Sequence, residues 1–171
     1  MTTADIMKRM ILFSNGDRHD VEHFLKVTAY ARTIGLCEGL DPKTLRTLEI
    51  AAIVHDIACP LCRERYGNTN GKAQEREGVP LVYAFFDGTD LEPEVLDRVA
   101  YLVGHHHTLT GIDGPDYQIL LEADYLVNAS ESRYPLSNVR NSLERLFRTD
   151  TGKTLLRSLY LGGGEGRTDA T

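Results

Sequence analysis

The spacing of apolar residues constrains the fold of this chain most strongly, because these residues recur at helical intervals. Segment 21–34 carries one such stripe, and a second helix is predicted to begin at Asp41-Pro42. This helix is expected to end by Cys59, because the residue before Pro60 avoids the helical region. Further helices are predicted over 74–86, with an interruption near 78–80, and over 93–103, 115–127, 136–147 and 153–160. No alternating segment of useful strand length occurs, so we expect an all-α fold of about six to eight helices.

The length of 171 residues suits one domain, and 42% hydrophobic with 26% charged residues is an ordinary globular balance. We find no internal repeat and no interdomain linker, and therefore expect a single helical domain over 1–161 with its core in 18–130. Residues 162–171 are predicted to form a flexible C-terminal tail. Segment 63–71, rich in Gly, Asn and charge, is predicted to be a surface loop.

The charge balance argues against binding of a nucleic-acid polymer, because the net charge of −6 is acidic and such modules are usually basic. No apolar run approaches the ~20 residues that span a bilayer, so no membrane association is expected. The N-terminus lacks the pattern of a signal peptide, and three Cys make a disulfide framework unexpected. The sequence therefore favours a cytoplasmic protein.

The Cys59-x-x-Cys62 pair has the spacing of some zinc and redox sites. A structural zinc ion needs four ligands, and only Cys37 remains; a redox pair usually lies in a βαβ unit, which is absent here. We therefore expect buried or half-buried thiols at these two positions.

Three ionisable residues, His23, His55 and Asp124, lie on apolar faces of predicted helices. A buried carboxylate is costly unless it has a charged or donor partner, and a shared metal ion would satisfy all three groups. Asp56 follows His55 directly and can reach an ion held just off the helix surface. Taken singly, each residue has an ordinary alternative as a hydrogen-bonded core histidine, a cap or an ion-pair partner. His19, one turn before His23, is expected to be exposed, the alternative being that it supports a ligand.

The order H…HD…HH…D resembles the HD-domain superfamily of metal-dependent phosphohydrolases. The resemblance covers about residues 18–130 and rests on the segments DVEHFLKVTAYA, AAIVHDIA, YLVGHHHT and ILLEADYLVN. It implies that one divalent metal is bound by His23, His55, Asp56 and Asp124. It also implies an HD-domain-like helical bundle.

Where members of this superfamily hold a second ion, the Asp of the HD pair bridges the two metals, and further histidines complete the site. Here His105 and His106 match best, with His107 the alternative if the frame shifts by one residue. The dinuclear members usually supply another His before this cluster, and this chain has Glu77 instead. Glu77 is thus a candidate ligand for a hard metal, the alternative being a solvated charge. The sequence does not distinguish one ion from two, or Fe, Mn, Ni, Co, Zn and Mg from each other.

The resemblance implies hydrolysis of a small phosphoester, with a nucleotide as the favoured substrate, by metal-activated water that Asp56 helps to orient. Lys72 and Arg76 are candidate phosphate-binding residues, the alternative being ordinary surface charges. Segments 63–71 and 108–114 are expected to shape the substrate site. Two other functions stay open: a di-iron oxygenase of the same superfamily, and a metal-binding regulatory module without catalysis.

Overall fold

The structure is a computed structural model that describes residues 1–162, and within this range it contains helices and no strand. The α-helices are α1 Thr3–Phe13, α2 Arg18–Cys37, α3 Pro42–Val54, α4 Cys59–Tyr66, α5 Gly71–Phe86, α6 Pro93–Val103, α7 Pro115–Glu131, α8 Leu136–Arg145 and α9 Asp150–Leu156. A short π-helix, η1, follows over Arg157–Leu161. The predicted all-α helical bundle is confirmed.

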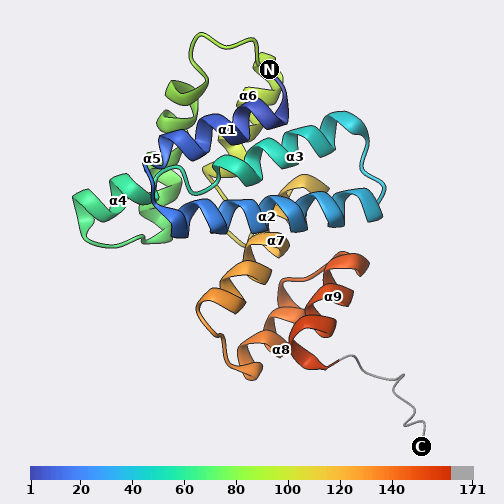
Figure 1. The fold of residues 1–171 in the computed structure, drawn as a ribbon. Coiled ribbons are helices and arrows are strands. Elements are labelled where there is room, and N and C mark those ends of the chain that lie inside the picture. The colour runs from blue at the N-terminus through green and yellow to red at the C-terminus, as the bar shows by residue number, and fades with distance from the viewer. Residues whose placement is uncertain (163–171) are drawn as a thin grey trace, which may run out of the picture.

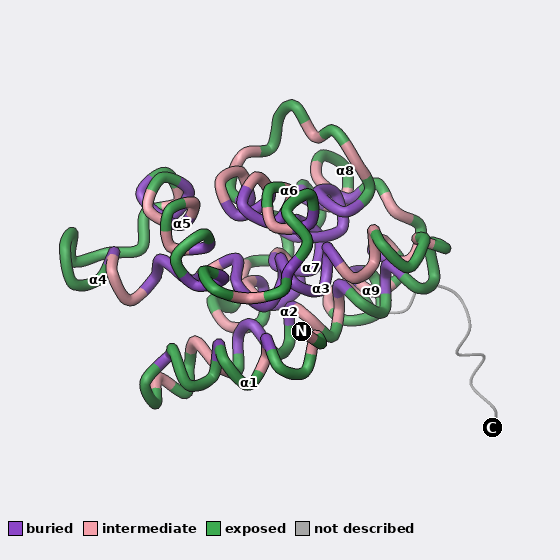
Figure 2. The backbone as a smooth tube through the Cα atoms, turned by 90° about the horizontal axis from the view of Figure 1, so that it is seen from above, coloured by how far each residue is buried: buried purple, intermediate pink, exposed green. Residues whose placement is uncertain are grey.

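Helices α2, α3 and α7 form the centre of the bundle, where α2 packs against both of the others (Figure 1). Helix α7 is the most enclosed of the three, since every residue from Asp116 to Asp124 is buried. The buried backbone in Figure 2 is concentrated along these same elements. Polar side chains on α2, α3 or α7 that face the shared core are therefore held among rigid neighbours.

Side chains that cap the helices explain where several of them begin. Asp17 accepts from the backbone N–H of Asp20 at the start of α2, and Asp41 accepts from two N–H groups at the start of α3. Asn70 does the same for α5. The predicted start at Asp41-Pro42 is confirmed.

The second predicted helix ends before Cys59, as expected, although Pro60 is not the residue that terminates it. Helix α3 ends at Val54, residues 55–58 form a turn, and Pro60 lies in the first turn of α4. Proline is tolerated there because N–H groups in a first turn have no helical acceptor. Segment 63–71 was predicted to be a loop, but its first part is helical. Helix α4 continues to Tyr66 and ends at Gly67, which has φ +67°.

The interruption predicted near 78–80 is also absent, because α5 continues through Pro80. Gly78 has a packing role instead: a Cβ there would lie 2.7 Å from a methyl group of Val103 on α6. The lack of a Cβ atom at Gly78 lets α5 and α6 approach closely. The N-terminal helix α1, which was not predicted, buries Ile6 and Met10 in the same core.

Helices α8 and α9 correspond to the predicted segments 136–147 and 153–160, and Figure 1 shows them together beside one end of α7. Glu122 of α7 is fully buried and accepts from Gln118 Nε2, from the N–H groups of Arg148 and Thr149, and from the Thr149 hydroxyl. One carboxylate thus attaches the α8–α9 connection to the central helix.

The predicted tail, apart from Gly162, lies outside the described residues, and the predicted domain limits stay a prediction. Among the described helices, none combines the length and apolar character needed to cross a bilayer.

Candidate metal centre

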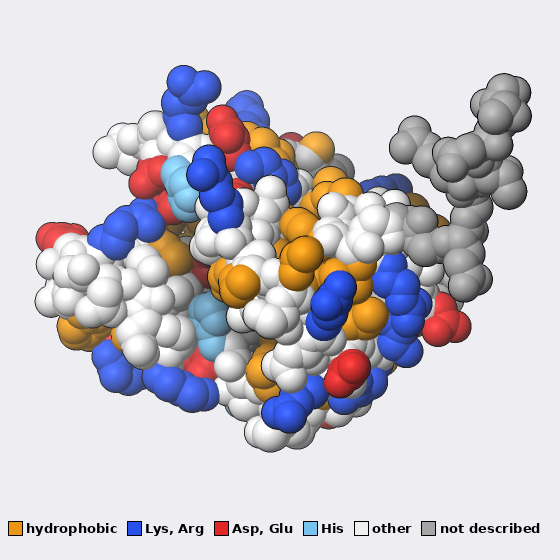
Figure 3. All heavy atoms as spheres, turned by 90° about the horizontal axis from the view of Figure 1, so that it is seen from below, with side chains coloured by type: hydrophobic (Ala, Val, Ile, Leu, Met, Phe, Trp, Pro, Cys, Tyr) orange, Lys and Arg blue, Asp and Glu red, His pale blue; other side chains and the backbone are white. Residues whose placement is uncertain are grey.

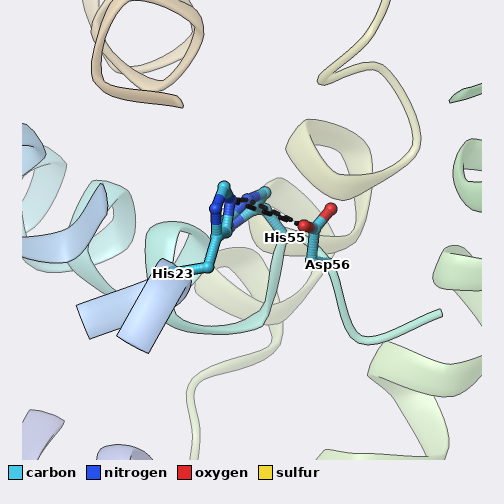
Figure 4. Close-up of side chains that lie close together, drawn as sticks. All are labelled: His23, His55 and Asp56. Carbon is cyan, nitrogen blue, oxygen red and sulfur yellow. Dashed lines mark hydrogen bonds and ion pairs between the residues drawn. The ribbon is translucent and has the colours of Figure 1, made fainter. Parts of the chain in front are cut away.

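His23, His55 and Asp56 converge on one point between α2 and the turn that follows α3 (Figure 4). The Nε2 atoms of His23 and His55 are 3.2 Å apart, and Asp56 Oδ2 lies 3.5 Å from the first and 3.6 Å from the second. On a continuous helix, neighbouring side chains would diverge by about 100°. The break after Val54 turns both members of the His-Asp pair toward His23.

Asp124 reaches the same point from α7. Its Oδ1 lies 3.2 Å from His23 Nε2 and 3.5 Å from His55 Nε2, and it accepts a 2.8 Å hydrogen bond from Asn128 Nδ2. The structure therefore brings together the four residues that the resemblance assigned to the first metal.

Each imidazole is held by a hydrogen bond on the nitrogen that faces away from the cluster. The acceptors of the three Nδ1 atoms are Glu131 Oε2 at 2.9 Å for His23, Ala52 O at 2.9 Å for His55 and Val103 O at 2.7 Å for His106. Carbonyl and carboxylate oxygens only accept, so each Nδ1 carries a proton. Each Nε2 is then left to present its lone pair to the cluster when the ring is neutral.

This arrangement fits a bound cation. Two Nε2 lone pairs that face each other at 3.2 Å repel unless a proton or a cation lies between them. His106 Nε2 is buried and has no hydrogen-bond partner, although Asp56 Oδ1 is 3.3 Å away. Imidazole nitrogens combined with carboxylate oxygens are a donor set for divalent transition metals.

The electrostatics of the cluster agree with this fit. Burial opposes protonation of His23, but the hydrogen bond to Asp124 and the charge of Asp56 outweigh it and raise its pKa to about 9. Burial would raise the pKa of Asp56 and Asp124, yet the neighbouring histidines lower both below the usual range. The carboxylates therefore attract protons to the histidines, and a cation would replace those protons.

A second group of potential ligands shares Asp56 with the first and adds His106 and His107, with ligand atoms within 4.8 Å of one another. Burial and the charge of His106 lower the pKa of His107 to about 4, so this ring is neutral at pH 7. Its backbone N–H donates to buried Glu75, and a Cβ on Gly71 would lie 2.7 Å from its ring. Helix α5 therefore positions His107 at the cluster.

Two of the predicted ligands lie outside both groups. His105 stacks on Tyr101 with ring centroids 4.2 Å apart, and its Nδ1 donates to the Tyr101 carbonyl. Glu77 accepts from the Tyr66 hydroxyl and pairs with Arg76. In the described residues, His107 thus occupies the position expected for His105, and no counterpart of Glu77 reaches the cluster.

The two predicted phosphate-binding residues lie outside the cavity at the cluster. Lys72 pairs with Glu75 at 2.7 Å and donates to the Thr108 hydroxyl, which orients it toward the loop after α6. Arg76 stacks over the Tyr66 ring and pairs with Glu77 on the surface. Their charges are used within the protein because acidic neighbours on α5 lie closer than the cluster does.

The thiols and His19 agree with expectation. Cys59 and Cys62 are buried, and burial raises the pKa of Cys59, whose Sγ donates to Gln74 Oε1. Neither thiol belongs to a group that could hold a metal among residues 1–162. The His19 side chain is 76% exposed.

Sequence reasoning missed Glu131, Asn128 and Glu75. Asn128 and Glu131 follow Asp124 on α7 at intervals of four and seven residues, respectively, which places all three on one helical face. That spacing is a signal that could have identified them. Glu75 had no comparable signal, because its partners His107 and Thr108 belong to a loop far away in sequence.

A cavity of about 820 Å³ opens onto the cluster. Its walls come from α2, the turn after α3, α4, α5, α7 and α8, and include both His106 and His107. Figure 3 shows the face with this hollow, where histidine side chains lie at its edge and Lys and Arg side chains are spread around it. A small molecule can therefore reach the convergent nitrogens and carboxylates.

Comparisons with known proteins place this site in a family. The HD-domain family model matches residues 20–133, which contain both groups of potential ligands. A search of curated proteins found no match. The fold resembles the crystal structure of a predicted HD superfamily hydrolase from an uncultured Thermotogales bacterium, with a TM-score of 0.66 and 21% identity over 92% of this chain and 84% of that chain. The chain belongs to the HD-domain family.

Proposed function

We propose that this protein is a metal-dependent phosphohydrolase that cleaves a small phosphoester, with a nucleotide as the favoured substrate. The observation that carries the proposal is the convergence of three imidazole Nε2 atoms and two carboxylates at the end of an open cavity. Family membership supports metal-dependent hydrolysis as the class of reaction. The free thiols fit a reducing compartment, so we also propose a cytoplasmic location.

In this proposal His23, His55, Asp56 and Asp124 hold one divalent ion, and His106 and His107 hold a second together with Asp56. The two groups share Asp56, whose Oδ2 faces His23 and His55 while Oδ1 faces His106. A carboxylate that presents one oxygen to each group suits a bridging role.

A divalent ion held by these residues would supply an activated water, because a bound divalent metal lowers the pKa of its water toward neutrality. The protein supplies the geometry. Glu131 and the backbone carbonyls hold the imidazoles in one orientation, and Asn128 holds Asp124. We assign Asp56 the additional role of orienting the attacking water, because its carboxylate lies between the two groups and borders the cavity.

Phosphate recognition is proposed to come from the cavity wall. Of the Lys and Arg side chains in residues 1–162, Arg63 and Arg145 border the cavity, whereas Lys72 and Arg76 do not. Arg63 pairs with Asp17 and Asp20, which hold it at the mouth.

The test is to load purified protein separately with Fe, Mn, Ni, Co, Zn and Mg, measure bound metal by mass spectrometry, and assay a phosphoester panel that includes nucleotides. His55→Ala and Asp124→Ala should lose both metal and hydrolysis. His105→Gln is the matched control, because it alters a neighbouring histidine outside both groups and should retain both properties.

The outcomes separate the three functions. Metal-loaded protein that is inert on every phosphoester would refute phosphohydrolase activity. Oxygen consumption strictly dependent on iron would identify the di-iron oxygenase. Metal-loaded protein that neither hydrolyses a phosphoester nor consumes oxygen would indicate the metal-binding regulatory module without catalysis.

A further inference from the structure

One face of α8 forms part of the cavity wall, and α8 follows all of the candidate metal ligands in the sequence. Asn138, Asn141, Ser142 and Arg145 all border the cavity and recur at the three- and four-residue spacing of a single helix face. This face lies beyond the family match, which ends at residue 133. The family model therefore does not account for this face.

Arg145 carries an unpaired positive charge within residues 1–162. The other arginine of the cavity, Arg63, pairs with two aspartates, whereas no acidic group of the described residues lies within ion-pair distance of Arg145. The acidic side chains that border the cavity come from α2, the turn after α3 and α7, and none comes from α8. Segment 133–157 contains six Lys or Arg and two Asp or Glu, in a chain with 19 and 25 overall.

The amides beside Arg145 also favour an anion. Asn138 Oδ1 accepts a 2.6 Å hydrogen bond from the Tyr125 hydroxyl, so its Nδ2 group is left as a donor. Asn141 is exposed and makes no side-chain hydrogen bond within the described part of the chain. This wall thus presents a guanidinium and amide N–H groups, which bind carboxylate or phosphate oxygens.

The wall is attached firmly to the helix that carries Asp124. Gln118 Nε2 donates to the Leu146 carbonyl at 2.8 Å, Glu122 accepts from the Arg148 and Thr149 backbone, and Val139 is fully buried. The distance between the cluster and this wall is therefore set by α7, and a ligand of matching length can bridge the two.

We propose that the α8 wall binds a second anionic group of the substrate, with Arg145 as its main contact and Asn138 and Asn141 as donors. This inference rests on the proposed phosphohydrolase function. The scissile phosphate lies at the metal cluster, and a second phosphate or a carboxylate at the other end of the molecule lies at Arg145. The substrates are thus phosphoesters with a second negative charge, and Arg145 determines specificity.

Binding of non-hydrolysable phosphonates tests the proposal without turnover. Mn²⁺-loaded protein is titrated calorimetrically with alkylphosphonates of increasing length that end in a carboxylate, a second phosphonate or a methyl group. One length with an anionic end should bind best, and comparison of the carboxylate and phosphonate series identifies the preferred anion. Arg145→Gln should weaken the binding of that compound about tenfold and leave the affinity for its methyl-ended counterpart unchanged.

Arg140→Gln is the matched control, because it removes the same charge from the same helix at a position that does not border the cavity. Arg140→Gln should still bind the anionic compound more tightly than the methyl-ended one. Arg145→Lys should retain part of this difference, which Arg145→Gln loses. Equal binding of anionic and methyl-ended compounds, an equal loss in Arg140→Gln, or no binding of any phosphonate would overturn the inference. Failure of the phosphohydrolase function has a different signature, namely metal-loaded protein that hydrolyses no phosphoester.

Discussion

Replacing Glu131 with Ala tests whether the hydrogen bonds behind the imidazoles control metal binding. Glu131 Oε2 accepts from His23 Nδ1 at 2.9 Å, while His23 Nε2 faces Asp124. A hydrogen bond to a charged group contributes about 1.5–3 kcal/mol. If that contribution supports the ligand geometry, Mn²⁺ affinity should fall about tenfold to hundredfold.

The pH dependence of this loss has a definite sign. The hydrogen bond to Glu131 is one of the contacts that raise the pKa of His23 to about 9, so a proton competes with the metal at neutral pH. Removing Glu131 lowers that pKa and weakens the competition, which offsets part of the loss at low pH. The difference between wild type and variant should therefore grow from about pH 6.5 to about pH 8.5.

The assay is competition for Mn²⁺ with a fluorescent chelator at both pH values. Lys26→Met is the matched control, because Lys26 Nζ contacts the other Glu131 oxygen at 3.2 Å and does not touch His23. It should change the affinity less than about twofold. Equal affinities of wild type and Glu131→Ala at both pH values would refute the reasoning.

Three further predictions concern stability and geometry. Glu122→Ala removes the buried acceptor of the Thr149 N–H and hydroxyl groups and should lower the free energy of unfolding by about 3 kcal/mol. Urea denaturation measures this loss, and an unchanged midpoint would contradict the role of Glu122 as an anchor. In metal-free protein, the pKa of His23 is raised to about 9, and this stabilises the fold most fully below about pH 6.5. The free energy of unfolding should fall by about 3 kcal/mol as the pH rises from there through about 9. Denaturation at several pH values across this range measures the loss. If the proposed two-ion site is right, Gly71→Val should displace His107 and lower the metal stoichiometry from two ions to one, and two retained ions would contradict this role of His107.

Much of the fold and part of the candidate site could be predicted because they depend on local signals. Apolar periodicity and caps such as Asp41 located most helices, and the order of His23, His55, Asp56 and Asp124 indicated which residues would meet. These features are encoded within a few residues of each helix. The ligand roles of the converging residues stay a prediction.

The errors arose where contacts between distant segments decide the local structure. Pro60 marks the start of a helix because α3 has already ended at Val54, and Gly78 serves close packing with Val103. The difference between His105 and His107 depends on stacking against Tyr101 in one case and on contacts with α5 in the other. A single sequence gives no measure of such contacts.

Helix α7 separates two tasks between its sides. Asp124 faces the cluster, and Glu122, two residues earlier, holds the C-terminal helices. The segment after residue 133 is thus attached to α7 on a side that does not carry Asp124, through Glu122 and the Gln118–Leu146 hydrogen bond. Under the proposed function, changes in this segment should alter ligand selectivity without altering metal binding, because α7 carries the cluster and the C-terminal helices on different sides.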